Sequence, residues 1–187
     1  MKTLDFVHLT LLALGGSISG KTNLQKKVYF LGILTGEIDK LGYRPHYYGP
    51  YSEGVATAVE DLKTVGLVDQ NVTSAFGVDE MGFERRRYDY TLTLDGRRLA
   101  ESRKADFPRF WEKLEKAVTA LKTSGEKDYI KLSIAAKTYF MINKDANDTT
   151  EDELARLAPR FGWRVTEGEI REAAEYLSKL KLIRIMH

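Results

Sequence analysis

Eight consecutive residues near the N-terminus fit the pattern of a nucleotide-binding loop. Residues 15–22 read Gly-Gly-Ser-Ile-Ser-Gly-Lys-Thr, which matches G-x-x-x-x-G-K-[ST] at every fixed position. Such a loop binds phosphates with its backbone N–H groups, and the helix that follows adds its N-terminal dipole. The sequence therefore raises nucleotide binding as one function for this chain.

The residues around this segment favour a turn between two helices instead. A phosphate loop needs a parallel sheet behind it, whereas the strands predicted after it form an antiparallel hairpin. The nearest carboxylate that could hold magnesium is Asp69, which follows only the short run Gly66-Leu67-Val68. Thr22 and Gln25 have the spacing of a capping box, which marks a helix start. Nucleotide binding through residues 15–22 is therefore a minor alternative.

Other enzyme chemistry finds little support in the composition. The chain has no cysteine, which excludes disulfides, thiol nucleophiles and cysteine-based metal sites. Its three histidines, His8, His46 and His187, do not stand at metal-ligand spacing. No Ser/His/acid arrangement or isolated carboxylate pair stands out. We expect a non-enzymatic protein with no catalytic residues, no metal and no cofactor.

The bulk composition is that of a globular protein. The chain has 187 residues, of which 43% are hydrophobic, enough for a packed core. Its formal net charge is +2, so any nucleic-acid site has to be local. No apolar run reaches the roughly 20 residues of a membrane span. Asp5 and His8 interrupt the apolar N-terminus and no cleavage site follows, so we expect a cytoplasmic protein without a signal peptide.

Periodicity and capping residues predict helices and one hairpin in the N-terminal part. Residues 5–14 are assigned to a helix by assumption, because this short apolar run also fits a strand. The elements expected after it are a helix over 22–41, an extended connector over 43–51, a helix over 52–65, strands over 67–72 and 87–92 around a loop over 74–84, and a helix over 93–103. This order is typical of a winged-helix domain.

The remainder of the sequence reads as a helical bundle. Asp106 can cap a helix that has Pro108 in its first turn, and a further helix is expected over 129–143. Two capping boxes follow, Thr150 with Glu153 and Thr166 with Glu169, on either side of a tight turn over 161–165. The predicted fold is mainly α with a small antiparallel hairpin (α+β). It comprises a winged-helix-like domain over 1–104 and a helical C-terminal domain over 105–187 with a second helix-turn-helix outline.

Two short motifs stand in register in the N-terminal part. They are Gly20-Lys21-Thr22-Asn23-Leu24-Gln25-Lys26 and Tyr48-Gly49-Pro50-Tyr51-Ser52. Together they resemble the YwgA-like group of uncharacterised bacterial and archaeal proteins and, more distantly, the Panacea antitoxin domain, over about residues 5–100. The resemblance implies a winged-helix-like fold without an established enzyme activity, and a helix start at the Gly-Lys-Thr segment. The likeness to Panacea implies an antitoxin-like protein partner.

The third predicted helix is poorly suited to read DNA bases. In a winged helix this element enters the major groove and presents Arg, Lys, Asn or Gln. Residues 52–65 carry three acidic residues and a single lysine, with no Asn, Gln or Arg. Phosphates would repel such a helix, so we do not expect direct base readout from it.

The predicted wing is basic. Residues 84–104 hold seven basic and four acidic residues. Arg85, Arg86 and Arg87 stand where the hairpin re-enters, a position suited to contacts with the DNA backbone or minor groove. The predicted nucleic-acid contacts are Arg85, Arg86, Arg87, Arg97, Lys21, Lys26 and Lys27. The same charges also fit a solvated basic face with local salt bridges.

Two classes of function follow from these features. The working hypothesis is a regulatory winged-helix protein that associates with DNA through its wing, with a homodimer through the C-terminal helices as one arrangement. The alternative is a protein-interaction module that has kept the fold and lost the DNA readout. Its partner groove would contain Tyr47, Tyr48 and Tyr51, although an aromatic–glycine turn is also typical of a corner of the core. The arginines favour the first class and the acidic helix favours the second.

Overall fold

The protein is mainly helical with a small three-stranded antiparallel sheet, as the sequence predicts. The computed structural model describes residues 1–78, 84–125, 128–145 and 149–185, with the backbone alone for 74–78, 84–86 and 145. The N-terminal elements are α1 (Thr3–Ala13), β1 (Ser17–Ser19), α2 (Lys21–Thr35), the 3-10 helix η1 (Ile38–Leu41), α3 (Glu53–Thr64), β2 (Val68–Val78), β3 (Glu84–Leu92) and α4 (Leu94–Lys104).

The first element is a helix, and it lacks a periodic signal because it is buried on all sides. Residues 6–12 of α1 are all buried, so no polar face marks the helical repeat. The helix ends where the N–H groups of Gly15 and Gly16 return to the carbonyl oxygens of Leu12 and Leu11. The assumption of a helix over 5–14 is therefore confirmed.

The second helix differs from its prediction at both ends. It begins at Lys21 with Gly20 as N-cap and no side-chain cap, so the predicted capping box of Thr22 and Gln25 is wrong. It ends at Gly36, which has a left-handed φ of 78°, and the separate turn of η1 then runs to Gly42. The expected continuous helix over 22–41 is thus two helices that fold back on each other.

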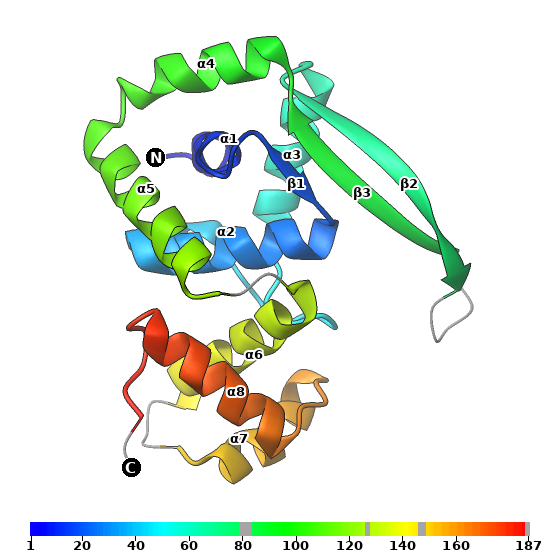
Figure 1. The fold of residues 1–187 in the computed structure, drawn as a ribbon, viewed down its shortest axis with the longest axis vertical. Coiled ribbons are helices and arrows are strands. Elements are labelled where there is room, and N and C mark those ends of the chain that lie inside the picture. Colours follow the sequence, from blue (N-terminus) through cyan, green and yellow to red (C-terminus); the bar gives the residue numbers. More distant parts are fainter. Residues whose placement is uncertain (79–83, 126–127, 146–148, 186–187) are drawn as a thin grey trace.

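The sheet has the order β1–β3–β2 and all pairs are antiparallel. Strand β1 was not predicted, and the expected loop over 74–84 is shorter because β2 extends to Val78 and β3 begins at Glu84. Register pairs alternate between two faces. The pairs on one face are Val68–Leu92, Gln70–Tyr90 and Val72–Tyr88, and this face is buried at Val68 and exposed at Val72. The pairs on the other face are Asp69–Thr91, Asn71–Asp89 and Thr73–Arg87. In Figure 1 the β2–β3 hairpin extends away from the helices.

The C-terminal part is helical throughout its described residues. Its elements are α5 (Pro108–Thr123), α6 (Tyr129–Asp145), α7 (Glu151–Leu157), the 3-10 helix η2 (Ala158–Phe161) and α8 (Glu167–Lys179). Asp106 does not cap α5, because the N-cap is Phe107 and it makes no side-chain hydrogen bond.

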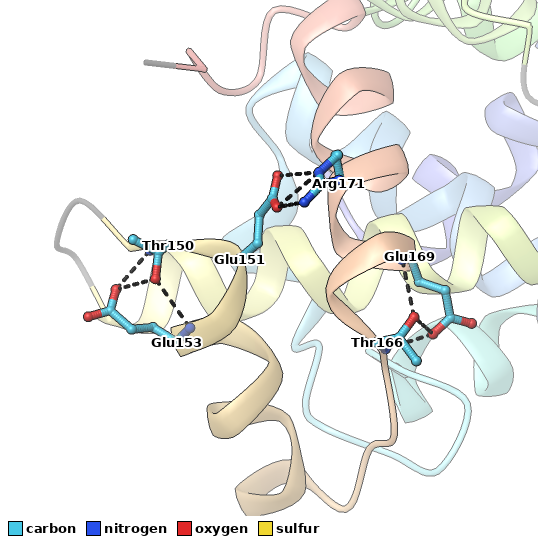
Figure 2. Close-up of polar contacts among 6 residues, drawn as sticks. All are labelled: Thr150, Glu151, Glu153, Thr166, Glu169 and Arg171. Carbon is cyan, nitrogen blue, oxygen red and sulfur yellow. Dashed lines mark hydrogen bonds and ion pairs between the residues drawn. The ribbon is translucent and has the colours of Figure 1, made fainter. Parts of the chain in front are cut away.

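Both predicted capping boxes in this part are present. The hydroxyls of Thr150 and Thr166 accept from the N–H groups of Glu153 and Glu169, whose carboxylates accept from the threonine N–H groups (Figure 2). A bidentate ion pair from Arg171 to Glu151 then joins α8 to α7, with the shorter N–O distance at 2.8 Å. Local sequence signals thus set both helix starts.

One connected core joins the N-terminal and C-terminal helices. Helix α2 lies between α1, α3 and α4 on one side and α6, α7 and α8 on the other (Figure 1). Three aromatic pairs cross the predicted boundary at residue 104: Phe6–Phe110, Tyr29–Tyr139 and Phe30–Tyr176, with ring centroids 5.4, 6.5 and 6.0 Å apart. The division into domains over 1–104 and 105–187 stays a prediction. In the described part of the chain, no helix is long and apolar enough to cross a membrane.

The first turn of α4 is pressed against the residues that lead into the sheet. A methyl group added at Gly96 would lie 1.9 Å from the carbonyl oxygen of Leu67, and the Gly96 carbonyl oxygen lies 2.8 Å from Nε2 of the buried His8. Gly168, also in the first turn of a helix, has nothing within 4 Å of the same position. The two glycines therefore form a matched pair for testing this packing.

We expect Gly96→Ala to lower the free energy of unfolding by about 3 kcal/mol, because the methyl group must displace backbone rather than a flexible side chain. Gly168→Ala should raise it by about 0.5–1 kcal/mol through helix propensity. Urea unfolding followed by circular dichroism measures both. Equal effects of the two substitutions would show that α4 does not approach Leu67 this closely.

Candidate functional site

The segment that matches a phosphate loop has a different geometry. Ser17, Ile18 and Ser19 form β1 and pair with β3, and the N–H of Gly20 donates to the Tyr88 carbonyl oxygen. The guanidinium of Arg97 lies against Gly16 and donates to the Gly15 carbonyl oxygen at 3.1 Å. The described strands form an antiparallel sheet, without the parallel strand that carries a phosphate loop. The structure gives nucleotide binding no geometric support within its described residues.

The connector, residues 43–52, joins η1 to α3 and is held first by the side chain of Gln25. Its amide donates to the Ser52 carbonyl oxygen at 2.9 Å and accepts from the Ser52 N–H at 3.0 Å. The amide of a buried glutamine thus pairs with the backbone as a neighbouring strand would. Ser52 caps α3 by accepting from the Val55 N–H, as predicted, and its hydroxyl donates to the Leu41 carbonyl oxygen.

Lys26 holds the same connector two residues earlier, at Pro50. Its side chain is 1% exposed, and its Nζ donates to the Pro50 carbonyl oxygen at 2.6 Å. Burial, together with the charge of Lys137, lowers the pKa of Lys26 to about 7. Lys26 was predicted to contact nucleic acid, but its burial removes it from any surface that phosphates can reach.

The C-terminal helices contact the connector from the opposite side. Trp163 is buried, and its indole N–H donates to the His46 carbonyl oxygen at 2.6 Å. Gly49 has a φ of 100°, and a methyl group there would lie 3.1 Å from Cγ of Lys137 and 3.4 Å from the Ser133 carbonyl oxygen. The connector therefore lies between α2 and α6, and only glycine fits at position 49 without strain.

Two tyrosines at the tip of the connector face solvent. Tyr47 is 64% exposed and Tyr48 is 55% exposed, and their rings meet edge to face with centroids 4.9 Å apart. Tyr51 is half-buried with its ring 5.0 Å from the His46 ring, and its backbone bridges to Arg44. The structure thus brings Tyr47 and Tyr48 together as an exposed pair and places Tyr51 apart from them. We call Tyr47 and Tyr48 the tyrosine pair.

The other predicted nucleic-acid contacts are scattered or paired. Lys21 is exposed at the start of α2, directly after Gly20. The N–H of Gly20 donates to the carbonyl oxygen of Tyr88, which follows Arg87, so the backbones of Lys21 and Arg87 lie close together. Lys27 is half-buried, and burial followed by the charge of Lys122 lowers its pKa. The side chains of Arg85 and Arg86 lie outside the described residues, while their backbones belong to β3.

The described basic residues over 87–104 each contact a nearby oxygen. Arg97 is on the Gly15 carbonyl, and the ion pairs are Arg87–Asp89 at 3.1 Å, Arg98–Asp95 at 3.6 Å, Arg103–Asp106 at 3.3 Å and Lys104–Glu101 at 2.8 Å. Such exposed pairs contribute little to stability, but they cancel much of the local positive charge. The structure thus matches the interpretation of this segment as a solvated face with local salt bridges.

The exposed face of α3 is acidic. Glu53, Thr57, Glu60, Asp61 and Thr64 recur at helical spacing and are all exposed. Lys63, the lysine of this helix, pairs with Glu60 at 2.7 Å. Three carboxylates therefore lie on the face that would meet DNA if α3 entered a major groove.

The histidines do not come together. His8 is buried against Gly96 and burial lowers its pKa, whereas His46 is exposed on the connector. His187 lies outside the described residues. Among the residues that the structure describes, no group of three His, Asp or Glu side chains is placed to hold a metal ion.

Sequence reasoning missed the residues that hold the connector. Gln25 was interpreted as half of a capping box, Lys26 as a surface charge, and Trp163 as part of a turn. Their backbone partners lie between 24 and 117 residues away in the chain, so no local pattern revealed them. The two motifs in register were the one available signal, because Gln25 and Lys26 belong to the first and bond Pro50 and Ser52 of the second.

No family model matches the chain, and no curated protein matches it. The resemblance to the YwgA-like group therefore stays a prediction that depends on the two motifs.

The burial of Lys26 makes stability depend on pH. In the unfolded chain a lysine pKa is about 10.4, so between pH 7 and 10 the unfolded state binds more protons than the folded state. Stability should therefore rise with pH across this window, by up to about 1.4 kcal/mol per pH unit. The result is measured by urea unfolding from pH 7.5 to 9.5, below the range in which the buried Tyr29 and Tyr43, whose pKa values are raised, contribute.

Lys26→Met is the control for this prediction. It keeps an unbranched side chain one atom shorter than lysine and removes the titrating amine, so the rise should largely disappear. Lys27, whose pKa burial also lowers, remains in both proteins and cancels in the comparison, whereas the loss of the Lys26 charge also relieves Lys137, so part of the change in slope comes from Lys137. A variant with the same pH slope as the parent would show that Lys26 keeps its proton in the folded protein.

Proposed function

We propose that this protein is a winged-helix protein-interaction module whose partner binds the tyrosine pair of the connector. The order of helices and strands up to residue 104, with the sheet order β1–β3–β2, supports the winged-helix assignment. The observation that carries the function is that Tyr47 and Tyr48 are exposed on a segment whose neighbouring backbone is bonded by buried side chains.

Tyrosine pairs of this kind suit protein recognition. Tyrosine is enriched at binding hot spots, because a large ring with few rotatable bonds contacts a partner at low entropic cost. Single exposed apolar residues are common on any surface and need no explanation. Tyr47 and Tyr48 differ because they are adjacent, in ring contact, and anchored on both sides by Trp163 and Lys26. The loop is therefore ordered before a partner arrives, which lowers the cost of binding.

The charge distribution is the second reason to favour a protein partner. The acidic face of α3 opposes entry into a major groove, and Lys26 is buried. The cations described over 87–104 contact neighbouring oxygens, as shown above. Each of these features reduces phosphate binding without affecting a protein partner at the connector.

Site-specific photocrosslinking tests this function. With benzoylphenylalanine in place of Tyr47, we expect one dominant crosslinked protein in extracts of the source cells. Benzoylphenylalanine in place of Leu94, which is 66% exposed on α4, should not give that band. Adding Tyr48→Ala should reduce the crosslink at position 47 about tenfold or more, as for a hot-spot residue. Leu99→Ala on α4 should leave the crosslink unchanged. Equal crosslinking at positions 47 and 94 would rule out the tyrosine pair as a site.

Association with DNA is a second candidate, because the β2–β3 hairpin extends away from the helices and carries three consecutive arginines (Figure 1). Fluorescence anisotropy of a labelled duplex tests it. Binding through four phosphates should weaken about a hundredfold between 50 and 200 mM salt, and Arg85/Arg86/Arg87→Ala should flatten that slope. The control is Arg109/Lys113/Lys116→Ala on α5, which removes three exposed charges far from the hairpin in the sequence. No binding at 50 mM salt, or equal effects of both triple variants, would exclude the wing.

A further inference from the structure

We infer that the C-terminal helices position the tyrosine pair, so that partner binding at the connector depends on how α6, α7 and α8 are docked. This inference rests on the proposed function of Tyr47 and Tyr48. It gives residues 105–187 a role in the binding site without any contact between them and the partner.

Two sets of contacts hold the connector, and they meet at Gly49, where an added methyl group would lie 3.4 Å from Cε of Lys26 and 3.1 Å from Cγ of Lys137. Residues 50 and 52 are bonded by α2, through Lys26 and Gln25. Residues 46 and 49 contact the C-terminal helices, through the indole N–H of Trp163 and through the close packing of Gly49 on α6. The tyrosine pair, at positions 47 and 48, lies between those last two contact points. The tip that would bind a partner is therefore fixed by the C-terminal helices.

The dependence of the tyrosine pair on the C-terminal helices centres on one atom, the carbonyl oxygen of His46. The His46 carbonyl accepts from the Trp163 indole N–H at 2.6 Å and from the Gly49 N–H at 2.9 Å. The first bond comes from the C-terminal part and the second closes the turn that contains both tyrosines. Because both donors converge on one oxygen, a displacement of Trp163 changes the position of the turn itself.

The position of Trp163 depends on how the C-terminal helices pack together. Its ring is stacked on Phe161 of η2 with centroids 5.1 Å apart and meets Phe140 of α6 edge to face at 5.7 Å. It lies two residues after the end of η2 and four residues before the start of α8, in the turn between them. Any shift of α8 against α6 therefore moves the indole that holds the connector. A ligand or partner that reorients these helices would change the affinity at the tyrosine pair, and binding at the pair would act back on them equally.

Hydrogen exchange measures this coupling without any partner. Trp163→Phe removes the indole donor and keeps an aromatic ring in the core, and we expect the Gly49 amide to exchange at least about tenfold faster. Trp111→Phe on α5 is the matched control, because it makes the same substitution outside the aromatic cluster of Trp163, Phe161 and Phe140. Faster exchange of Gly49 in Trp163→Phe alone supports the inference, whereas unchanged exchange overturns it.

A second variant approaches the coupling from the connector and leaves the C-terminal core intact. Gly49→Ala is strained at its φ of 100° and its methyl group meets Lys137, so the connector should move off α6. The indole proton of Trp163 should then exchange faster in NMR spectra. Trp111, the other tryptophan, lies on α5 and serves as the internal reference. If Gly49→Ala changed the exchange rates of the two indole protons by the same factor, the inference would be overturned. This result would hold even if Trp163→Phe proved too unstable to study.

The crosslink at position 47 links the coupling to function. Its yield should fall in Trp163→Phe and persist in Trp111→Phe. A yield that is unchanged although Gly49 exchanges faster would overturn the coupling to partner binding. If instead no specific crosslink forms at position 47 in the parent protein, the proposed function fails, while the exchange data still decide whether the C-terminal helices position the turn.

Discussion

The structure depends on the pairing of two adjacent buried polar side chains, Gln25 and Lys26, with the backbone of the connector. The last part of the connector is buried at Gly49, Pro50 and Ser52, where water cannot satisfy its peptide groups. Gln25 supplies both a donor and an acceptor to Ser52, and Lys26 supplies a donor to Pro50. Without these bonds the carbonyl of Pro50 and the N–H of Ser52 would be buried and unpaired, at a cost of about 1–3 kcal/mol each, whereas the Ser52 carbonyl would keep the N–H of Ala56.

Burying a lysine at position 26 carries a desolvation penalty, so the residue must contribute something that offsets this penalty. An amine buried to 1% exposure loses its hydration, and Lys137 adds repulsion, so its proton is held weakly. A long, unbranched side chain is nevertheless required to reach from α2 to the Pro50 carbonyl. The same chain also fills the space beside Gly49, whose added methyl group would lie 3.4 Å from Cε of Lys26. Reach and packing therefore outweigh the penalty of desolvation at this position.

Local signals in the sequence predicted the features that depend on local contacts. The capping boxes of Thr150 and Thr166, the Ser52 cap and the β2–β3 hairpin each involve residues that are close in the chain, and all are present. Features set by distant contacts were not predicted. Strand β1 is three residues long and exists because β3 provides its partner, and Gln25 left its expected cap because Ser52 offered a buried backbone pair. The tyrosines were predicted as candidates, but the bond that holds the turn beside Tyr47 comes from Trp163, which is more than 100 residues away in the chain.

The contacts of the basic residues also explain why their number along the sequence overstates the free positive charge on the surface. Basic residues were counted along the sequence, but a lysine or arginine on this protein can cap a loop, pair within its own helix or enter the core. Arg97 supports the Gly15–Gly16 turn, Arg103 and Lys104 pair with acids three residues away, and Lys26 is buried. The exposed tyrosine pair carries the proposed function instead, because burying Tyr47 and Tyr48 would remove apolar surface from water and the fold leaves both rings outside. A fold that bonds the backbone on both sides of these tyrosines and still exposes their rings has the arrangement of a preordered binding surface.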